Sequence, residues 1–340
     1  MPMTSIMSRY ASANASPNGP GDARPTALQI IRDEGLEGKL GDKVFVVTGG
    51  SSGIGIETVR ALHVTGATVI TTVRNVSKGQ AVVDDILAAD PNNKAPIQLV
   101  KLELDSLASV REGAKEILSK SKGQVNVLVN NAGVMATPFG LTKDGFETQF
   151  ATCHLGHFLL FELLKPALLS SATPSFPSRV VNVSSIGHRV AEVRFDDFNF
   201  GDGKTYDPWL SYGQAKTANI YLANEIERQY GSQNLHATSV HPGVILTGLQ
   251  VHVKELMATP SEELKKVLKS TEQGAATSVY AAVSKDWEGK GGRFLAECTE
   301  QGPADPNAGM SMSDTGYAPW AYDEEKEKKL WSASLKMVGL

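Results

Sequence analysis

Short apolar runs alternate along this chain with longer amphipathic segments. The runs are rich in Val, Ile and Leu, and they lie at 43–47, 67–72, 97–102, 125–129, 179–183, 236–240 and 293–295. Such runs are typical of strands that are buried on both faces of a parallel sheet. The segments between them predict helices at 56–62, 78–89, 107–121, 146–169, 211–230 and 271–284. This alternation predicts an α/β fold: a single doubly wound, Rossmann-type parallel sheet with helices on both faces.

The two ends of the chain follow other patterns. Residues 1–25 are rich in Ser, Ala, Asn, Pro and Gly without periodicity, and we expect a disordered tail there. Their prolines and sparse arginines make a poor amphipathic helix, which argues against a transit peptide. Residues 26–36 predict a short helix docked on the core, and the mixed charges at 323–329 predict the solvated face of a C-terminal helix. We therefore expect one domain over 26–340, with a C-terminal helical extension.

A glycine turn directly follows the first expected strand. It reads Thr48-Gly49-Gly50-Ser51-Ser52-Gly53-Ile54-Gly55. Between a strand and a helix, glycines let the backbone approach phosphates closely, and the helix N-terminus supplies N–H donors and a positive dipole end. The spacing differs from the usual G-x-G-x-x-G, so a plain structural turn is the alternative. We favour nucleotide binding, with the candidate residues Gly49, Ser51, Ser52, Gly53, Ile54 and Gly55.

Tyr212 and Lys216 form the second motif. They stand four residues apart in an expected helix, so their side chains share one face of it. A free tyrosine titrates near pH 10, and a nearby ammonium favours the phenolate and lowers that pKa. A Tyr-x-x-x-Lys spacing also occurs by chance on exposed helices. Because it follows a glycine turn in the same chain, we favour a role in acid–base chemistry.

Several further motifs carry a resemblance to a known family. They are His154-Leu155-Gly156-His157-Phe158, Tyr212-Gly213-Gln214-Ala215-Lys216-Thr217-Ala218-Asn219, Ala318-Pro319-Trp320 and Leu330-Trp331. With these motifs in this order, the chain resembles the short-chain dehydrogenase/reductase superfamily, in its retinol-dehydrogenase-like and WW-domain-oxidoreductase-like branch. The resemblance spans about residue 41 to the C-terminus. We expect no WW module before the domain, and no membrane anchor such as the microsomal retinol enzymes have.

The resemblance implies an oxidoreductase that interconverts a carbonyl and an alcohol by hydride transfer. Tyr212 would be the general acid/base, and Lys216 would lower its pKa and bind the nicotinamide ribose. Ser185 would orient the substrate carbonyl and stabilise the oxyanion, with Ser184 as the alternative if the register differs. The cofactor performs the electronic step, while the protein contributes position and electrostatics.

The end of the second strand bears on the choice of nucleotide. In this family, an acidic residue there accepts a hydrogen bond from the 2′-hydroxyl of NAD and repels a 2′-phosphate. Here Val73 takes that position and Arg74 follows it. A guanidinium without a competing carboxylate favours the phosphate, so we expect NADP as the cofactor. A solvent-exposed arginine at a strand end is the alternative.

The resemblance assigns four more residues to the cofactor. Asp105 would contact the adenine ring, and Asn131 would lie in the floor of the cleft. Val244 would also contact the cofactor, and Thr247 would bind near the nicotinamide. For Asp105 the alternative is a helix N-cap before the helix expected from residue 107.

Composition and charge exclude several classes of partner. A net charge of -4 at pH 7 argues against nucleic acid, and no apolar run reaches the length of a membrane span. The two cysteines, Cys153 and Cys298, cannot form a disulfide framework and fit a reducing compartment, so we expect a cytoplasmic protein. The histidines at 154, 157, 188 and 241 do not form a recognised metal-ligand set, and we expect them to be structural. The oligomeric state stays open between a monomer and a homo-oligomer.

Cys153 departs from the family pattern. It replaces the asparagine that usually precedes the His-Leu-Gly-His-Phe segment and completes the proton relay of the family. A different class of function is therefore kept as the alternative: an NADP-binding regulatory or scaffold protein with weak or no turnover. Because the chain retains the serine, tyrosine and lysine of the site, we favour the enzyme.

The sequence leaves the substrate undefined. Residues 191–210 and 249–269 are expected to form the wall and lid of the substrate site. Five apolar side chains in these segments suggest a small apolar ligand, although they suit a core equally well: Phe195, Phe198, Phe200, Trp209 and Leu249.

Overall fold

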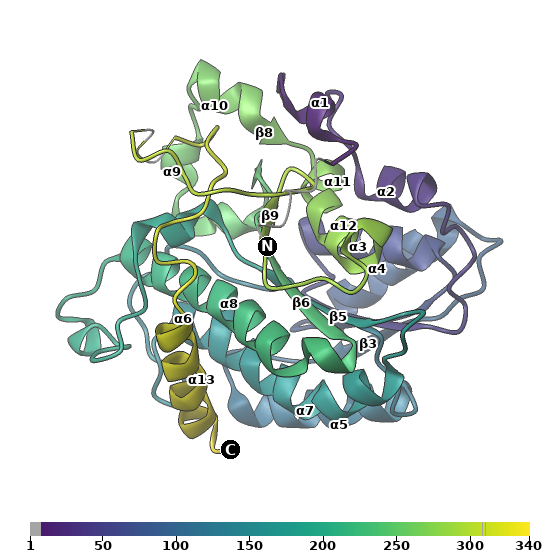
Figure 1. Cartoon of the computed structure of the whole chain (residues 1–340), viewed down its shortest axis with the longest axis horizontal. Helices are drawn as coiled ribbons and strands as arrows, with labels where there is room; N and C mark the ends of the chain where they lie inside the picture. The colour runs from purple at the N-terminus through teal and green to yellow at the C-terminus, as the bar shows by residue number, and fades with distance from the viewer. Residues whose placement is uncertain (1–7, 308, 310) are drawn as a thin grey trace.

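An eight-stranded sheet forms the centre of the molecule (Figure 1). The computed structural model describes residues 8–307, 309 and 311–340. The strand order is β10-β9-β6-β5-β4-β1-β2-β3, and every neighbouring pair is parallel except β9 and β10. These strands are β1 (Val44–Thr48), β2 (Thr68–Val73), β3 (Ile97–Lys101), β4 (Val127–Asn130), β5 (Ser178–Val183), β6 (Leu235–Val240), β9 (Phe294–Ala296) and β10 (Thr299–Glu300). The expected doubly wound sheet is thereby confirmed.

A separate two-stranded parallel sheet is formed by β7 (Val244–Ile245) and β8 (Leu268–Lys269). Helices cover both faces of the large sheet (Figure 1). The longer ones are α2 (Ala27–Asp33), α3 (Ile54–Val64), α4 (Val76–Ala89), α5 (Leu107–Lys120), α7 (Gly156–Ser171), α8 (Pro208–Tyr230), α12 (Ala276–Val283) and α13 (Glu324–Val338). Short helical segments are α1 (Ala11–Asn14), α6 (Thr148–Phe150), α9 (Lys254–Met257), α10 (Glu262–Val267) and α11 (Thr271–Gly274).

Two hydrophobic cores lie on opposite faces of the sheet. Val44 and Val46 of β1 pack into the core beneath α5, α7, α8 and α13. Phe45 and Val47 pack into the other core, beneath α2, α3 and α12. Successive side chains of a strand point to opposite faces, so a strand covered on both sides must be apolar at every position. This explains the continuous apolar runs of the sequence.

The change of direction in the sheet positions the site. β1 lies between β2 and β4, so the chain winds outward from β1 in both directions. Ligands of such sheets bind beyond the carboxyl ends of the strands, at this switch point. The glycine turn follows β1, Arg74 follows β2, Asn131 follows β4 and Ser184 follows β5. The motifs therefore share one edge of the sheet.

The N-terminal segment differs from the sequence-based expectation. Residues 1–7 of the expected disordered tail lie outside the described residues, but residues 8–25 pack against the domain. Tyr10 and Arg24 are both buried. The Tyr10 hydroxyl donates to Asp33 over 2.9 Å, and its ring packs edge-on against Tyr280 at 6.0 Å. The expectation of disorder does not hold for residues 8–25, because a few side chains supply contacts that a composition-based argument does not register.

Two expected helices also differ in detail. The helix predicted over 146–169 is divided into α6 and α7 by a π-helical turn, Ala151–Leu155. The predicted C-terminal helix is present as α13, but its charged run is not wholly solvated. Glu327 is buried and pairs with Arg228 of α8, and it accepts a hydrogen bond from Asn224 over 2.6 Å. The paired charges lock α13 to the helix that carries Tyr212 and Lys216.

Candidate active site

The glycine turn packs tightly against the loop that follows β4. Gly49 has a positive φ of 77°, and a Cβ on it would lie 2.9 Å from the Cβ of Ala132. A Cβ on Gly55 would lie 2.2 Å from the carbonyl oxygen of Gly49. Side chains are excluded at both positions, so the backbone of the turn stays bare beside the N-terminus of α3. A bare backbone at a helix N-terminus fits a pyrophosphate. Ser51, Ser52 and Ile54 belong to the same turn, at or directly before the start of α3.

A buried network joins the ends of β1 and β4 to α7. The Nδ1 atom of His157 lies 3.0 Å from the carbonyl oxygen of Cys153, and a carbonyl can only accept, so Nδ1 carries the proton. Its Nε2 atom then accepts from the hydroxyl of Thr48 at 2.9 Å. The same hydroxyl oxygen accepts from the backbone N–H groups of Asn131 and Ala132, over 2.9 and 3.0 Å. This network fixes the loop after β4 beside the glycine turn.

Asn131, which the sequence analysis expects in the floor of the cofactor cleft, lies beside the glycine turn. Its Nδ2 atom donates to the carbonyl of Thr48 over 2.8 Å. Its Oδ1 atom is buried and has no hydrogen-bond partner among the residues that the structure describes. A buried acceptor without a partner costs free energy, which fits a surface completed by a ligand or by water.

Tyr212 and Lys216 lie together on the buried part of α8. Asp207 caps this helix by accepting from the N–H groups of Trp209 and Leu210, each over 2.8 Å. The Lys216 ammonium lies 5.5 Å from the centre of the Tyr212 ring and donates to the carbonyl of Val183 over 3.0 Å. The cap sets the start of the helix, and the Val183 carbonyl sets the position of the ammonium.

Burial dominates the titration of Tyr212. It raises the pKa of the phenol above its ordinary value, while the Lys216 ammonium and the Ser185 hydroxyl lower it by less. The sequence analysis expects the ammonium to bring this pKa down, and in the structure its effect is present but outweighed. At neutral pH Tyr212 is therefore protonated and can donate a proton.

The two serines after β5 have different partners. Ser184 is buried, and its hydroxyl donates to the backbone carbonyl of Lys216 over 2.7 Å. The Ser185 hydroxyl oxygen accepts from the N–H of Gly187 over 3.0 Å and interacts with the Tyr212 phenol. The geometry therefore favours Ser185 over Ser184 as the residue that faces a substrate.

Gly187 is a site residue that the sequence analysis missed. A Cβ at this position would lie 2.8 Å from Cε1 of the Tyr212 ring. Only glycine leaves room for the ring in its present place. A glycine two residues after the candidate serine is a weak signal by itself, and only the structure shows which ring it accommodates.

Cys153 lies in the π-helical turn before α7, close to Lys216. Its thiol donates to the carbonyl of Val134 over 3.5 Å. A Cβ built on Gly133 would lie 3.3 Å from the Cys153 sulfur and 3.6 Å from the Lys216 ammonium, so both line the same space. π-Helical turns inside α-helices are frequent at functional sites.

Arg74 and Asp105 lie at the outer part of the strand edge, and both are exposed. Arg74 directly follows β2. The alternative role of Asp105 as a helix cap is wrong, because Ser106 caps α5 by accepting from the N–H of Ser109 over 3.3 Å.

Val244 and Thr247 come from the segment that opens with β7 and closes with β8, called here the β7–β8 segment (residues 244–269). Thr247 lies over the glycine turn: a Cβ on Gly53 would be 3.3 Å from the Thr247 Cβ. The side chains of Thr247 and Gln250 form a capping box at the turn Gly248–His252. Thr247 is thereby held where the turn and the β7–β8 segment meet.

The four histidines that the sequence analysis considered as metal ligands are buried, and most have protein partners. His154 lies 2.8 Å from the Ser334 hydroxyl, and His188 lies between the Ser185 carbonyl and the N–H of Ala318. Burial lowers the pKa of His154 and of His241 to about 3. Within the described part of the chain, no cluster of three or more His, Cys, Asp or Glu side chains is placed to hold a metal ion. No helix among the described residues combines the length and apolarity that crossing a membrane requires.

Comparisons with known proteins agree with this geometry. A sequence profile for short chain dehydrogenase matches residues 43–197. The chain is 51% identical over 335 residues to the short-chain dehydrogenase/reductase prx1 of Penicillium roqueforti, an alignment that covers 98% of this chain and 95% of that protein. It is 35% identical over 298 residues to retinol dehydrogenase 12 of Mus musculus, covering 88% and 87% of the two chains.

A solved structure has the same fold. The Pseudomonas aeruginosa RhlG/NADP active-site complex matches with a TM-score of 0.61 at 21% identity, covering 77% of this chain and 96% of that one. The chain belongs to the short-chain dehydrogenase/reductase family, whose members are oxidoreductases that bind a nicotinamide nucleotide and act on small molecules. Within the family it falls in the retinol-dehydrogenase-like branch.

Proposed function

We propose that this protein is an NADP(H)-dependent oxidoreductase that interconverts a carbonyl and an alcohol on a small apolar substrate. The arrangement of Ser185, Tyr212 and Lys216 carries the proposal. Ser185 follows β5, and Tyr212 and Lys216 lie on α8. The Ser185 hydroxyl interacts with the Tyr212 phenol, and the Lys216 ammonium lies 5.5 Å from the centre of the Tyr212 ring.

The protein groups divide the proton chemistry between them. A bound nicotinamide nucleotide supplies the hydride for reduction and accepts it in the reverse direction. The Tyr212 hydroxyl donates its proton to the carbonyl oxygen, and the Lys216 ammonium stabilises the phenolate that remains. Because Gly187 N–H already donates to the Ser185 oxygen, the Ser185 proton is available for the developing oxyanion.

The choice of NADP rests on Arg74. It is the first residue after β2 and is exposed, and the residue before it, Val73, offers no carboxylate. An arginine in this position can bind a 2′-phosphate with paired N–H donors, whereas NAD has no group to match them.

Exposed apolar side chains support an apolar substrate. Of the three phenylalanines that the sequence analysis weighed as substrate contacts, Phe200 is buried, and Phe195 and Phe198 are partly buried and pack against the core. The Trp209 ring is partly exposed and lies edge-on to the Tyr212 ring at 6.3 Å. Other large exposed apolar side chains come from segments beyond the same strand edge: Phe139, Leu141, Leu210, Leu246 and Val251.

The alternative is an NADP-binding regulatory or scaffold protein. Cys153 is the residue that motivates it, whereas the proximity of Ser185, Tyr212 and Lys216 supports the enzyme. We therefore retain the enzyme as the proposal. We also propose a cytoplasmic location, since both cysteines are buried and unpaired, as is usual in reducing compartments.

A screen of carbonyls and alcohols tests the function. Purified protein is assayed with NADPH and NADP, following the nicotinamide absorbance, with NADH and NAD in parallel and Tyr212→Phe as the control. We expect turnover of apolar carbonyls that is faster with NADPH and is lost in the control. Tight NADPH binding without turnover of any compound would favour the regulatory alternative, and failure to bind either nucleotide would reject both.

A further inference from the structure

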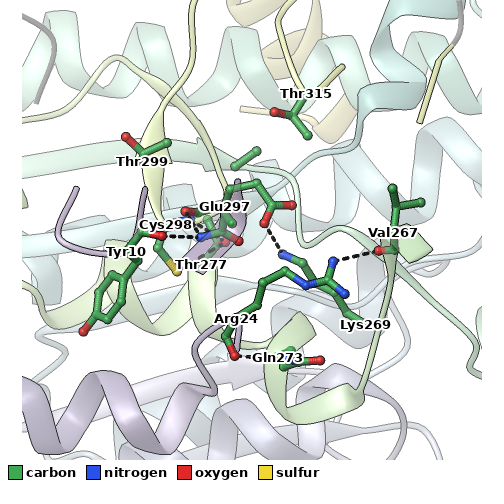
Figure 2. Close-up of polar contacts among 12 residues, drawn as sticks. Tyr10, Arg24, Val267, Lys269, Gln273, Thr277, Glu297, Cys298, Thr299 and Thr315 are labelled. Carbon is green, nitrogen blue, oxygen red and sulfur yellow. Dashed lines mark hydrogen bonds and ion pairs between the residues drawn. The ribbon is translucent and has the colours of Figure 1, made fainter. Parts of the chain in front are cut away.

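The N-terminal segment (residues 8–25) holds the β7–β8 segment through one buried arginine. The Arg24 guanidinium donates to the carbonyl oxygen of Val267 over 2.9 Å, as Figure 2 shows. A further N–H of the guanidinium donates to the carbonyl oxygen of Leu268 over 2.5 Å. It also donates to the carbonyl of Gly19 over 3.1 Å and pairs with Asp22 at 2.9 Å. Only 3% of Arg24 is exposed. A buried guanidinium that is satisfied chiefly by backbone carbonyls fixes the course of the chain that supplies them.

Gln273 joins the same two segments at the start of α11. Its Nε2 atom donates to the backbone carbonyls of Asp22 and Arg24, over 3.2 and 3.1 Å. Its Oε1 atom accepts from the backbone N–H groups of Gly21 and Ser270, over 2.9 and 3.0 Å. Both ends of this buried amide are therefore used, and they connect the N-terminal segment to the residue that follows β8.

A second buried cation continues the contact. Lys269 of β8 pairs with Glu297 at 3.0 Å, and Figure 2 shows this pair beside Arg24. The Glu297 carbonyl accepts from Nδ2 of Asn14 in α1 over 3.1 Å. Glu297 and Cys298 both have a φ of 54°, which is unfavourable for residues other than glycine. The turn keeps this backbone because the N-terminal segment and β8 hold it in place.

These contacts connect the N-terminal segment, through β8 and β7, to the glycine turn. β8 pairs with β7 in register, with Val244 opposite Leu268. A Cβ on Gly274 would lie 2.6 Å from the Ile245 side chain and 2.8 Å from the Ile54 side chain, so α11, β7 and the glycine turn are in contact. The chain that Arg24 holds is therefore the chain that carries Val244 and Thr247 to the glycine turn.

We propose that Arg24 is a positioning residue for nucleotide binding. Through the carbonyls of β8 it keeps the β7–β8 segment against the glycine turn, with Lys269 and Gln273 completing the attachment. The N-terminal segment thus contributes to nucleotide affinity without touching the nucleotide. This inference rests on the proposed function, because it assigns the affected ligand as NADP(H).

The apparent affinity for nucleotide depends on how often the β7–β8 segment lies against the glycine turn in the free protein. If release of the segment leaves it in place for only about a tenth of the time, the apparent Kd rises about tenfold. Once nucleotide saturates the protein, the segment is held by the ligand, so kcat should change little. A variant that is only less stable overall would not combine a tenfold higher Kd with an unchanged kcat.

Arg24→Ala in the full chain tests the proposal. Arg32→Ala is the matched control, because Arg32 lies in α2 and makes an exposed ion pair with Glu37. NADPH binding is titrated by fluorescence, and hydrogen exchange is measured on the free proteins. For Arg24→Ala we expect about tenfold weaker NADPH binding, faster exchange over residues 244–273 and nearly unchanged kcat at saturation. Arg24→Lys should restore part of the affinity, and Arg32→Ala should behave as the wild type.

Gln273→Glu provides a second variant in case Arg24→Ala does not fold. It keeps the acceptors for Gly21 and Ser270 but removes the donations to Asp22 and Arg24, and we expect the same pattern of effects. Unchanged NADPH affinity in a folded Arg24→Ala or Gln273→Glu protein, or unchanged exchange over residues 244–273, overturns the inference alone. A wild-type protein that binds neither NADPH nor NADH overturns the proposed function and this inference with it.

Discussion

The carbonyl oxygen of Cys153 accepts a hydrogen bond from Nδ1 of His157 over 3.0 Å. The imidazole is held in turn by the Thr48 hydroxyl, so the main chain at position 153 is fixed by groups other than its own side chain. In the family, the asparagine at this position helps to hold the water of a proton relay. If the main-chain carbonyl is the chief ligand of that water, a cysteine at this position preserves the relay.

Cys153→Asn should therefore change kcat by less than tenfold. The thiol is a weak donor and acceptor, and an amide in its place adds hydrogen-bonding capacity without moving the main chain. Lys216→Ala, in contrast, should remove most of the activity, because it deletes the ammonium beside Tyr212. Steady-state kinetics of both variants on one verified substrate check this pair. An inert wild type that becomes active as Cys153→Asn would contradict the prediction and favour the regulatory alternative.

Tyr212→Phe should lower kcat by about two to four orders of magnitude, the usual contribution of general acid–base catalysis. NADPH affinity should stay within a few fold, because the ring remains in its slot beside Gly187. Tyr230→Phe, at the far end of the same helix, serves as the control for changes to α8. Equal turnover of wild type and Tyr212→Phe would remove Tyr212 from the mechanism.

Arg74→Ala should weaken NADPH binding by roughly tenfold while NADH binding changes little. The lost hydrogen bonds involve a charged phosphate, which contributes about 1.5–3 kcal/mol, and exposure to solvent reduces that figure. Arg74→Asp should reverse the preference between the two nucleotides. Fluorescence titrations with both nucleotides measure the ratio, and Lys94→Ala, at the opposite edge of the sheet, is the control. An unchanged ratio would reject Arg74 as the determinant.

Stability should fall as the pH drops below about 6.5. Burial lowers the pKa of His154 and His241 to about 3, and of His157 and His188 to about 4. The unfolded chain binds protons on these four side chains near pH 6.5 while the folded chain does not, so their contribution is present above pH 6.5 and is lost toward pH 4.

Four such groups give a slope of up to about 5 kcal/mol per pH unit in the middle of that range. Two carboxyl groups with pKa values raised by burial, Glu57 and Glu147, act in the opposite direction and reduce this slope. Melting temperatures measured between pH 7.5 and 4.5 should show a steep decrease. A melting temperature independent of pH over that range would contradict the neutral, buried state of these histidines.

Local patterns in the sequence predicted seven of the eight strands of the large sheet and the order of the main motifs along the chain, but not the short antiparallel strand β10. The apolar run at 43–47 predicts β1 because a strand covered on both faces has no polar position, and the glycines after it predict a bare turn. Other features depend on long-range contacts. Arg24 meets β8 more than two hundred residues away, and the two strands β7 and β8 are each two residues long. Neither the contact of Arg24 with β8 nor these two short strands produce a periodic pattern in the sequence.

The direction in which the pKa of Tyr212 shifts could not be predicted from the sequence either. The spacing of Tyr212 and Lys216 gives the sign of the effect of the ammonium, but the opposing effect of burial depends on the whole surrounding fold. The same holds for the preference for Ser185 over Ser184, because it rests on the hydrogen-bond partner of each hydroxyl. Sequence patterns indicate which residues meet at a strand edge, and packing decides what each of them can do there.

The hairpin turn at Glu297 and Cys298 has a consequence for engineering this protein. Two-residue hairpins with positive φ at both positions favour Asn-Gly, so a stability-guided redesign would replace both residues and gain local conformational energy. That exchange would also leave the Lys269 ammonium buried without its carboxylate. A variant optimised by turn statistics would thus trade an unfavourable backbone for an unpaired charge beside the nucleotide cleft. At these two positions, selection for thermostability is therefore expected to favour Asn-Gly, whereas selection for ligand affinity is expected to retain Glu297.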